Sequence, residues 1–91
     1  MPRVARHVRV TGQVQGVFFR AWTREQADRL DVRGWVRNSA DGSVEAHIEG
    51  TEESVAQLIQ LLQRGPSGAR VDDLQVSDVE PENRDWFAVR H

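Results

Sequence analysis

The stretch RGWVRNSADGSVEAHIE, residues 33–49, lies at the middle of the chain and predicts two strands joined by a tight turn. Its Asp41-Gly42 pair is a strong hairpin signal, because both residue types tolerate the positive φ angles that short turns require. Residues 33–38 before the turn and residues 43–49 after it have the pattern of strands. The centre of the sequence is therefore expected to form an antiparallel hairpin.

The pattern also predicts which side chains of the hairpin face the core. Trp35 and Arg37 share one face of the first strand. In the second strand apolar residues occupy every other position, so we expect three of them to point inward: Val44, Ala46 and Ile48. The polar residues that alternate with them are expected to point outward: Glu45, His47 and Glu49.

Two further elements precede the hairpin. Alternating valines predict a strand over about residues 4–11. Apolar residues at steps of three and four then predict a helix over about residues 19–30, with Trp22 beside its apolar stripe. A loop with two glycines, Gly12 and Gly16, separates the strand from the helix.

The elements after the hairpin mirror those before it. Thr51 is suited to cap a helix, which the Gly65-Pro66 pair ends. Residues 71–79 predict a strand with a bulge near Asp72-Asp73, and residues 86–90 predict a short last strand.

The predicted order is β-α-β-β-α-β followed by a short C-terminal strand. Two β-α-β units joined by a hairpin form a split β-α-β sandwich, with an antiparallel-type sheet and both helices on one face. The fold class is therefore α+β. The length of 91 residues is typical of one domain, which we assign to residues 1–91.

Composition excludes several kinds of chemistry. The chain has no cysteine, which excludes disulfides, a thiolate nucleophile, cysteine-ligated zinc and iron–sulfur clusters. All 12 basic residues are arginine, so a catalytic lysine is excluded as well. The apolar stretches are too short to span a membrane, and no apolar signal core follows the N-terminus. We therefore expect a cytoplasmic protein.

The loop between the first strand and the first helix is the best candidate for a binding site. Gly12 and Gly16 permit positive φ angles, so successive amides can converge on an anion, and the helix N-terminus that follows also favours negative charge. Arg20 in the first helical turn opposes the helix dipole unless an anion is bound there. Eight arginines fall within the first 37 residues, which favours an anionic ligand in this half. The alternative is that Arg20 is a solvated surface residue and the glycines only turn the chain.

Other polar residues have simpler explanations. Asn38 ends a predicted strand where it can approach Arg20, but asparagine at that position also commonly serves a turn. Asp41 and Glu45 flank the turn, and turn formation explains Asp41 better than catalysis does. The three histidines have no metal-ligand spacing and are expected on the surface: His7, His47 and His91. The three tryptophans and three phenylalanines are expected mostly in or near the core.

Two motifs identify a family resemblance. Residues 12–20, GQVQGVFFR, resemble the first acylphosphatase signature, G-x-V-Q-G-V-x-[FY]-R. Residues 34–45, GWVRNSADGSVE, resemble the second, G-[FYW]-[AV]-x-N-x-x-D-G-x-V-E. The motifs occur in the family's order and spacing, and the length also matches, so the resemblance extends over essentially the whole chain.

The resemblance implies a ferredoxin-like fold and an enzyme that hydrolyses acyl phosphates to a carboxylate and inorganic phosphate. It implies that Arg20 grips phosphate oxygens, that Asn38 positions the attacking water, and that no metal or organic cofactor is required. The expected partner is the small acyl phosphate alone, with no nucleic acid and no membrane, and the chain is expected to be a monomer. The resemblance also implies that backbone amides cradle the phosphoryl group, from these residues: Gln15, Gly16, Val17, Phe18, Phe19 and Arg20.

Two other functions are open to this element order. RNA-recognition domains share it, but they expose aromatic residues on a basic sheet, whereas the outward residues expected here include no aromatic platform. A non-catalytic module that binds phosphate or acyl phosphate is the second alternative, as is a partner of a carbamoyl-phosphate-processing maturation enzyme. Turnover, as opposed to binding alone, distinguishes these from the hydrolase.

Overall fold

A computed structural model describes residues 3–90 of the chain. The elements follow the predicted β-α-β-β-α-β order with one further strand at the end, and their bounds are β1 (Arg3–Gln13), α1 (Phe19–Leu30), β2 (Arg33–Asn38), β3 (Val44–Thr51), α2 (Glu52–Arg64), β4 (Arg70–Val79) and β5 (Phe87–Arg90). The predicted hairpin is confirmed as β2–β3, in which Asn38 is paired with Val44. No helix within residues 3–90 is long and apolar enough to cross a membrane.

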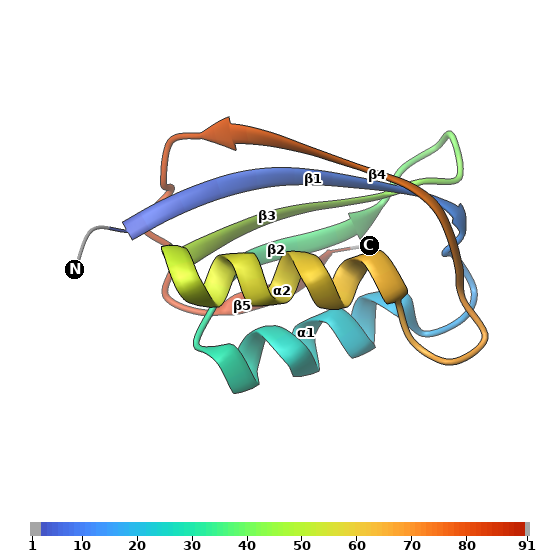
Figure 1. Cartoon of the computed structure of the whole chain (residues 1–91), viewed down its shortest axis with the longest axis horizontal. Coiled ribbons are helices and arrows are strands. Elements are labelled where there is room, and N and C mark those ends of the chain that lie inside the picture. The colour runs from blue at the N-terminus through green and yellow to red at the C-terminus, as the bar shows by residue number, and fades with distance from the viewer. Residues whose placement is uncertain (1–2, 91) are drawn as a thin grey trace.

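The strands form one five-stranded sheet in the order β4-β1-β3-β2-β5. The first four pair antiparallel, whereas β5 runs parallel to β2 at the edge of the sheet. Both helices cover the same face of the sheet (Figure 1). The predicted α+β split β-α-β sandwich is therefore confirmed, with a mixed sheet because of β5.

Local sequence signals account for the ends of several elements. The Thr51 side chain accepts a hydrogen bond of 3.1 Å from the Ser54 amide and caps α2, as predicted. Gly65 ends α2 with a positive φ of 70°. The bulge predicted near Asp72-Asp73 is also present, since the β1–β4 register shifts between Thr11 and Gly12, opposite those residues.

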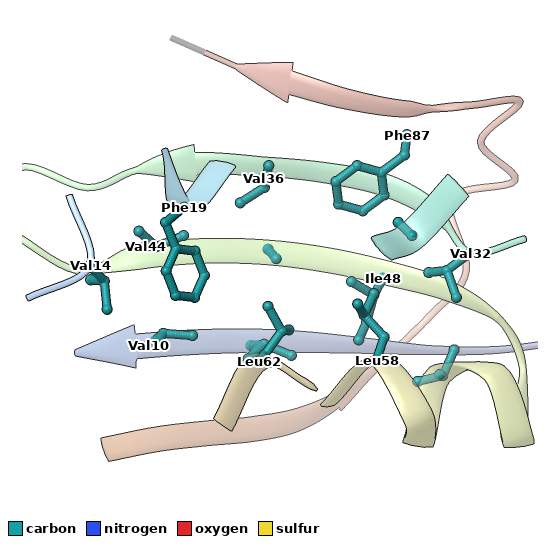
Figure 2. Close-up of a cluster of buried hydrophobic side chains, with 14 residues drawn as sticks. Val10, Val14, Phe19, Val32, Val36, Val44, Ile48, Leu58, Leu62 and Phe87 are labelled. Carbon is teal, nitrogen blue, oxygen red and sulfur yellow. The ribbon is translucent and has the colours of Figure 1, made fainter. Parts of the chain in front are cut away.

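The core lies between the helices and the sheet. It contains the predicted inward residues of β3 together with Leu58 and Leu62 of α2, all almost fully buried. Figure 2 shows Phe19 of α1 beside Val14 and Val44 at one end of the cluster. Phe19 is the first helical residue after the candidate binding loop, so core packing anchors the end of that loop.

The opposite face of the sheet corrects one prediction. Glu45, His47 and Glu49 do point away from the helices, but they are buried, with exposed fractions of 9%, 3% and 0%. β3 is flanked by strands on both sides, and long side chains from those strands cover it. The Trp35 ring stacks on His47 with centroids 6.1 Å apart, and the Arg90 guanidinium lies 4.5 Å above the Trp35 ring.

The far end of β3 is covered by the segment between β4 and β5. The Glu49 carboxylate accepts hydrogen bonds from the amides of Glu82 and Arg84, at 2.7 and 2.5 Å. Burial raises the pKa of Glu49, but these bonds and one from His47 outweigh it and keep the pKa below its usual range. A buried carboxylate thus ties the 82–84 segment to the sheet.

Some aromatic residues and histidines lie elsewhere than the sequence predicted. The expectation that aromatic residues are mostly in or near the core is wrong for Phe18 and Trp86, which are 85% and 67% exposed. The expectation that His47 lies on the surface is wrong for the reason given above, whereas His7 is half-buried. His91 lies outside the described residues.

Candidate active site

The loop between β1 and α1 has the geometry expected of an anion-binding nest. Gly16 and Phe18 have positive φ angles of 76° and 59°, and Phe18 is the residue that precedes α1. A bulky side chain rarely adopts this left-handed conformation, so the loop keeps its shape at some cost in backbone energy. Among residues 3–90, the amides of Gln15, Gly16, Val17 and Phe18 donate no hydrogen bond.

The start of α1 extends the same set of amides. Phe18 provides no side-chain cap, and the first turn has no acidic residue. The first hydrogen bond of the helix runs from the Trp22 amide to the Phe18 carbonyl, at 2.9 Å. The amide of Phe19, the first residue of the helix, is therefore also without an intrahelical partner. Five of the six amides assigned from the sequence are thus available on one loop and one helix end, those of Gln15, Gly16, Val17, Phe18 and Phe19.

Arg20 is half-buried and held from the end of the chain. Its Nη1 donates a hydrogen bond of 2.8 Å to the carbonyl of Arg90, the last residue of β5. Arg20 is therefore not the freely solvated residue that the alternative interpretation required. A guanidinium held beside unpaired amides concentrates positive charge at one place, which favours a phosphate or carboxylate.

Asn38 lies at the end of β2 with an exposed side chain. Within residues 3–90, that side chain makes no hydrogen bond, so it does not stabilise the adjacent turn. The turn is held by its neighbours instead. The Ser43 amide and hydroxyl donate to Asp41, at 3.0 and 2.6 Å. These bonds confirm the role of Asp41 in the turn, and they hold its pKa below the usual range.

One cavity of about 310 Å³ brings these residues together. Arg20 and Asn38 line it with Gly16, Phe18 and Phe19 of the first motif. In Figure 1 the β1–α1 loop and the β2–β3 turn lie at the same end of the sheet. The prediction that Asn38 can approach Arg20 is confirmed to the extent that both residues line the same cavity. The remaining lining residues are Val14, Ala21 and Val89.

Two residues that line the cavity were not predicted from the sequence. Val89 belongs to β5, which reaches the cavity only because it pairs beside β2. Ala21 follows Arg20 and has no chemical signal of its own. Trp22 lies beside the apolar stripe, as predicted: it packs edge-on against Phe19 with ring centroids 5.7 Å apart and does not line the cavity.

Gln15 connects the two halves of the site. Its Nε2 donates to the carbonyls of Ser39 and Ser43, at 2.9 and 2.8 Å. Gln15 and Val17 do not line the cavity themselves. The loop that carries the amides is therefore joined by a side chain to the turn that follows Asn38.

The lining of the cavity includes no acidic residue and no histidine among the residues that the structure describes. Residues 3–90 also contain no group of three or more histidine, aspartate or glutamate side chains placed to hold a metal ion. The chemistry available from the lining is thus electrostatic and positional: backbone amides, one guanidinium and one carboxamide.

Comparisons with known proteins point to one family. The family model described as Acylphosphatase matches residues 6–89. A curated acylphosphatase from Haloquadratum walsbyi is 51% identical over 97% of this chain and 95% of its own length. One from an Anaeromyxobacter species is 50% identical over the full length of both chains. The solved structure of an acylphosphatase from Coxiella burnetii superposes with a TM-score of 0.93 at 38% identity, over 97% of this chain and 93% of that one.

Proposed function

This chain belongs to the acylphosphatase family and is an acylphosphatase, and from that premise we propose which of its residues perform the hydrolysis. The amides of residues 15–20 and the Arg20 guanidinium bind the phosphoryl group of the substrate. Asn38 orients the water that attacks phosphorus. The apolar walls of the cavity, Phe18, Ala21 and Val89, border the place left for the acyl group.

One observation carries this proposal: Gly16, Phe18 and Phe19, whose amides are unpaired, line a single cavity together with Arg20 and Asn38. Unpaired amides are costly wherever they are poorly solvated, and a bound phosphoryl group would satisfy several of them at once. Asn38 also has a free side chain beside the same cavity.

The chemistry of an acyl phosphate suits a site built from backbone amides, one guanidinium and one carboxamide. The leaving group is a carboxylate, which is a weak base, so the P–O bond to it breaks without strong assistance from an acid. Phosphoryl transfer through a loose transition state depends mostly on positioning and on stabilising the equatorial oxygens. Preorganised amides and a guanidinium provide that stabilisation. The attacking oxygen bonds to phosphorus as the carboxylate departs, which gives inorganic phosphate and a carboxylate.

The proton of the attacking water must go elsewhere than to Asn38, because a carboxamide is not basic. The lining of the cavity offers no carboxylate or imidazole to accept it, among the described residues. The adjacent carboxylates, Asp41 and Glu45, have lowered pKa values and are bound by their own donors. We therefore assign the proton to a phosphate oxygen of the substrate, or to loss late in the reaction. A pH–rate profile governed by a carboxylate of the protein would contradict this step.

The domain extent, oligomeric state, location and partners of the enzyme belong to the same proposal. Residues 1–91 act as one domain, as a monomer in the cytoplasm, on a small acyl phosphate, without nucleic acid or membrane. The cytoplasmic location rests on the amino-acid sequence alone. Light scattering after gel filtration checks the oligomeric state.

The first experiment compares the wild type with Asn38→Ala in hydrolysis of benzoyl phosphate with EDTA present. We expect fast turnover by the wild type and a loss of at least about 100-fold in the variant, the scale of a misplaced reacting group. Inhibition by inorganic phosphate should be unchanged, because the amides and Arg20 remain. The control is Asn83→Gly at the other asparagine, which has a φ of 60° that glycine adopts readily.

Each outcome has a definite meaning. Turnover retained by Asn38→Ala removes Asn38 from the mechanism. A well-folded wild type that binds phosphate without turnover would favour the non-catalytic module instead. Loss of turnover in the Asn83→Gly control would mean that the assay reports stability, and the comparison would then be repeated at lower temperature.

A further inference from the structure

Glu45 is the most heavily bonded side chain near the active site, and the mechanism does not use it. It lies on the sheet face away from the helices and is 9% exposed. Its Oε1 accepts from Ser39 Oγ at 2.5 Å and from Arg9 Nη2 at 3.2 Å. Its Oε2 lies 3.1 Å from His7 Nε2 and accepts from Arg37 Nη2 at 3.3 Å. Four partners occupy about the full acceptor capacity of a carboxylate.

These partners come from three parts of the chain. His7 and Arg9 belong to β1, the strand that leads into the phosphate loop, and Arg37 belongs to β2. Ser39 belongs to the turn and directly follows Asn38. The carboxylate therefore ties the turn to the strand that carries the loop.

Arg9 adds a second connection between the same parts. Its Nη1 donates to Asp41 Oδ2 at 2.8 Å and to Ser43 Oγ at 2.9 Å, while its Nη2 reaches Glu45. The guanidinium thus ties the turn and the start of β3 to β1. Glu45 accepts hydrogen bonds both from this guanidinium and from the Ser39 hydroxyl. Loss of the Glu45 carboxylate would therefore loosen both connections.

Asn38 depends on such support more than the phosphate site does. The Asn38 side chain has no hydrogen bond of its own within residues 3–90, so its position is set by the backbone at the start of the turn. The turn itself is exposed at Ala40, Asp41 and Gly42. Arg20, by contrast, is held by a hydrogen bond to the Arg90 carbonyl.

We propose that Glu45 is a positioning residue for the hydrolysis: through Ser39 and Arg9 it holds the turn so that Asn38 keeps its place against the phosphate loop. This inference rests on the proposed role of Asn38. It predicts a specific kinetic effect, because a shift of Asn38 misplaces the water but leaves the phosphate-binding amides where they are. Turnover should fall while phosphate binding is kept.

The test compares Glu45→Gln with Glu49→Gln. Both changes remove a buried carboxylate from the same strand and the same sheet face, but Glu49 lies at the end remote from the turn and binds the 82–84 segment. We expect Glu45→Gln to lower kcat for benzoyl phosphate about tenfold, part of the roughly 100-fold cost of a 1 Å misplacement. The inhibition constant of phosphate should stay within about twofold. Glu49→Gln should lower the stability and leave kcat unchanged.

Ser39 supplies a second, independent variant in case Glu45→Gln does not fold. Ser39→Ala removes the 2.5 Å bond from the other side and should reproduce the fall in kcat. Ser39→Thr keeps a hydroxyl and should restore most of it. The double variant Ser39→Ala/Glu45→Gln should be little worse than Glu45→Gln alone, because both single changes remove the same connection.

The outcomes separate this inference from the proposed function. The positioning role is overturned if Glu45→Gln and Ser39→Ala keep the wild-type kcat, or lower it no more than Glu49→Gln does. It is also overturned if phosphate inhibition weakens in step with kcat, because the change would then act on the phosphate site. If Asn38→Ala itself keeps turnover, the assignment of Asn38 fails first, whatever Glu45→Gln does.

Discussion

Gly12 precedes the proposed phosphate loop and Gly16 lies within it, and the structure predicts unequal costs for changing each of them to alanine. Gly12 has a φ of 126°, and a Cβ there would lie 2.1 Å from the Arg70 carbonyl oxygen and 2.8 Å from the Asp72 amide. Gly16 has a φ of 76°, and a Cβ there would meet no atom within 4 Å. The first position is blocked by the neighbouring strand, whereas the second only requires a left-handed backbone.

The cost at each position follows from these distances. At Gly12 the carbonyl of β4 must retreat by more than 1 Å, which belongs to the class of overpacking that costs about 1–3 kcal/mol. The unfavourable φ adds about 1–3 kcal/mol. At Gly16 the only cost is that of the left-handed backbone conformation, about 1–2 kcal/mol. We therefore expect Gly12→Ala to lower the free energy of unfolding by about 4 kcal/mol, out of a typical total of about 5–15 kcal/mol.

Urea unfolding followed by tryptophan fluorescence measures both variants, since the chain has three tryptophans. Gly12→Ala should unfold at a much lower urea concentration than Gly16→Ala. Phosphate should still inhibit Gly16→Ala, because alanine can hold the same backbone direction there. The reasoning is refuted if Gly12→Ala is no less stable than Gly16→Ala, since the close approach of β4 would then not be what selects glycine.

Two further predictions concern charge. Arg20→Ala should lower kcat for benzoyl phosphate by at least about 100-fold, the scale of losing one preorganised donor, and activity above a tenth of the wild type would exclude Arg20 from the phosphate site. The second concerns acid: the hydrogen bond from Ser39, followed by that from His7, lowers the pKa of Glu45 to about 2 from an ordinary 4.5. The pKa of Glu45 is lower in the folded state than in the unfolded state, so the ionised carboxylate stabilises the fold fully above about pH 4.5, and this stabilisation is lost as the pH falls towards 2. The stabilisation amounts to at most about 3 kcal/mol. Solvent screening reduces it to about 1–2 kcal/mol. Urea midpoints at pH 6 and pH 2.5 should therefore fall further for the wild type than for Glu45→Gln, and equal falls would contradict the assignment.

The two faces of the sheet divide the work of the protein. One face, with the helices, forms the apolar core and anchors the phosphate loop through Phe19. The other carries buried charges: Glu45 near the active site and Glu49 at the far end. Glu45 joins the turn to β1, and Glu49 joins the 82–84 segment to β3. A sheet face that alternation marks as solvent-exposed thus contains the connections that hold loops in place.

The amino-acid sequence by itself determined the order of elements and indicated the residues of the proposed phosphate site. Alternation, helical spacing and the Asp41-Gly42 turn predicted every strand and helix, because these signals are local and repeat within each element. The two motifs also contain Arg20, Asn38 and the six loop amides within short segments. Local pattern was sufficient there, since each motif is a continuous segment of the chain.

Only the tertiary structure decided what surrounds them. The parallel pairing of β5 with β2 brings Val89 to the cavity and the Arg90 carbonyl to Arg20, and no local pattern specifies a partner that distant in sequence. The burial of Glu45, His47 and Glu49 was likewise unpredictable from alternation, which distinguishes the two faces of a strand but not what covers each face. Coverage depends on long side chains from neighbouring strands and on a distant segment, so it exists only once the sheet has formed.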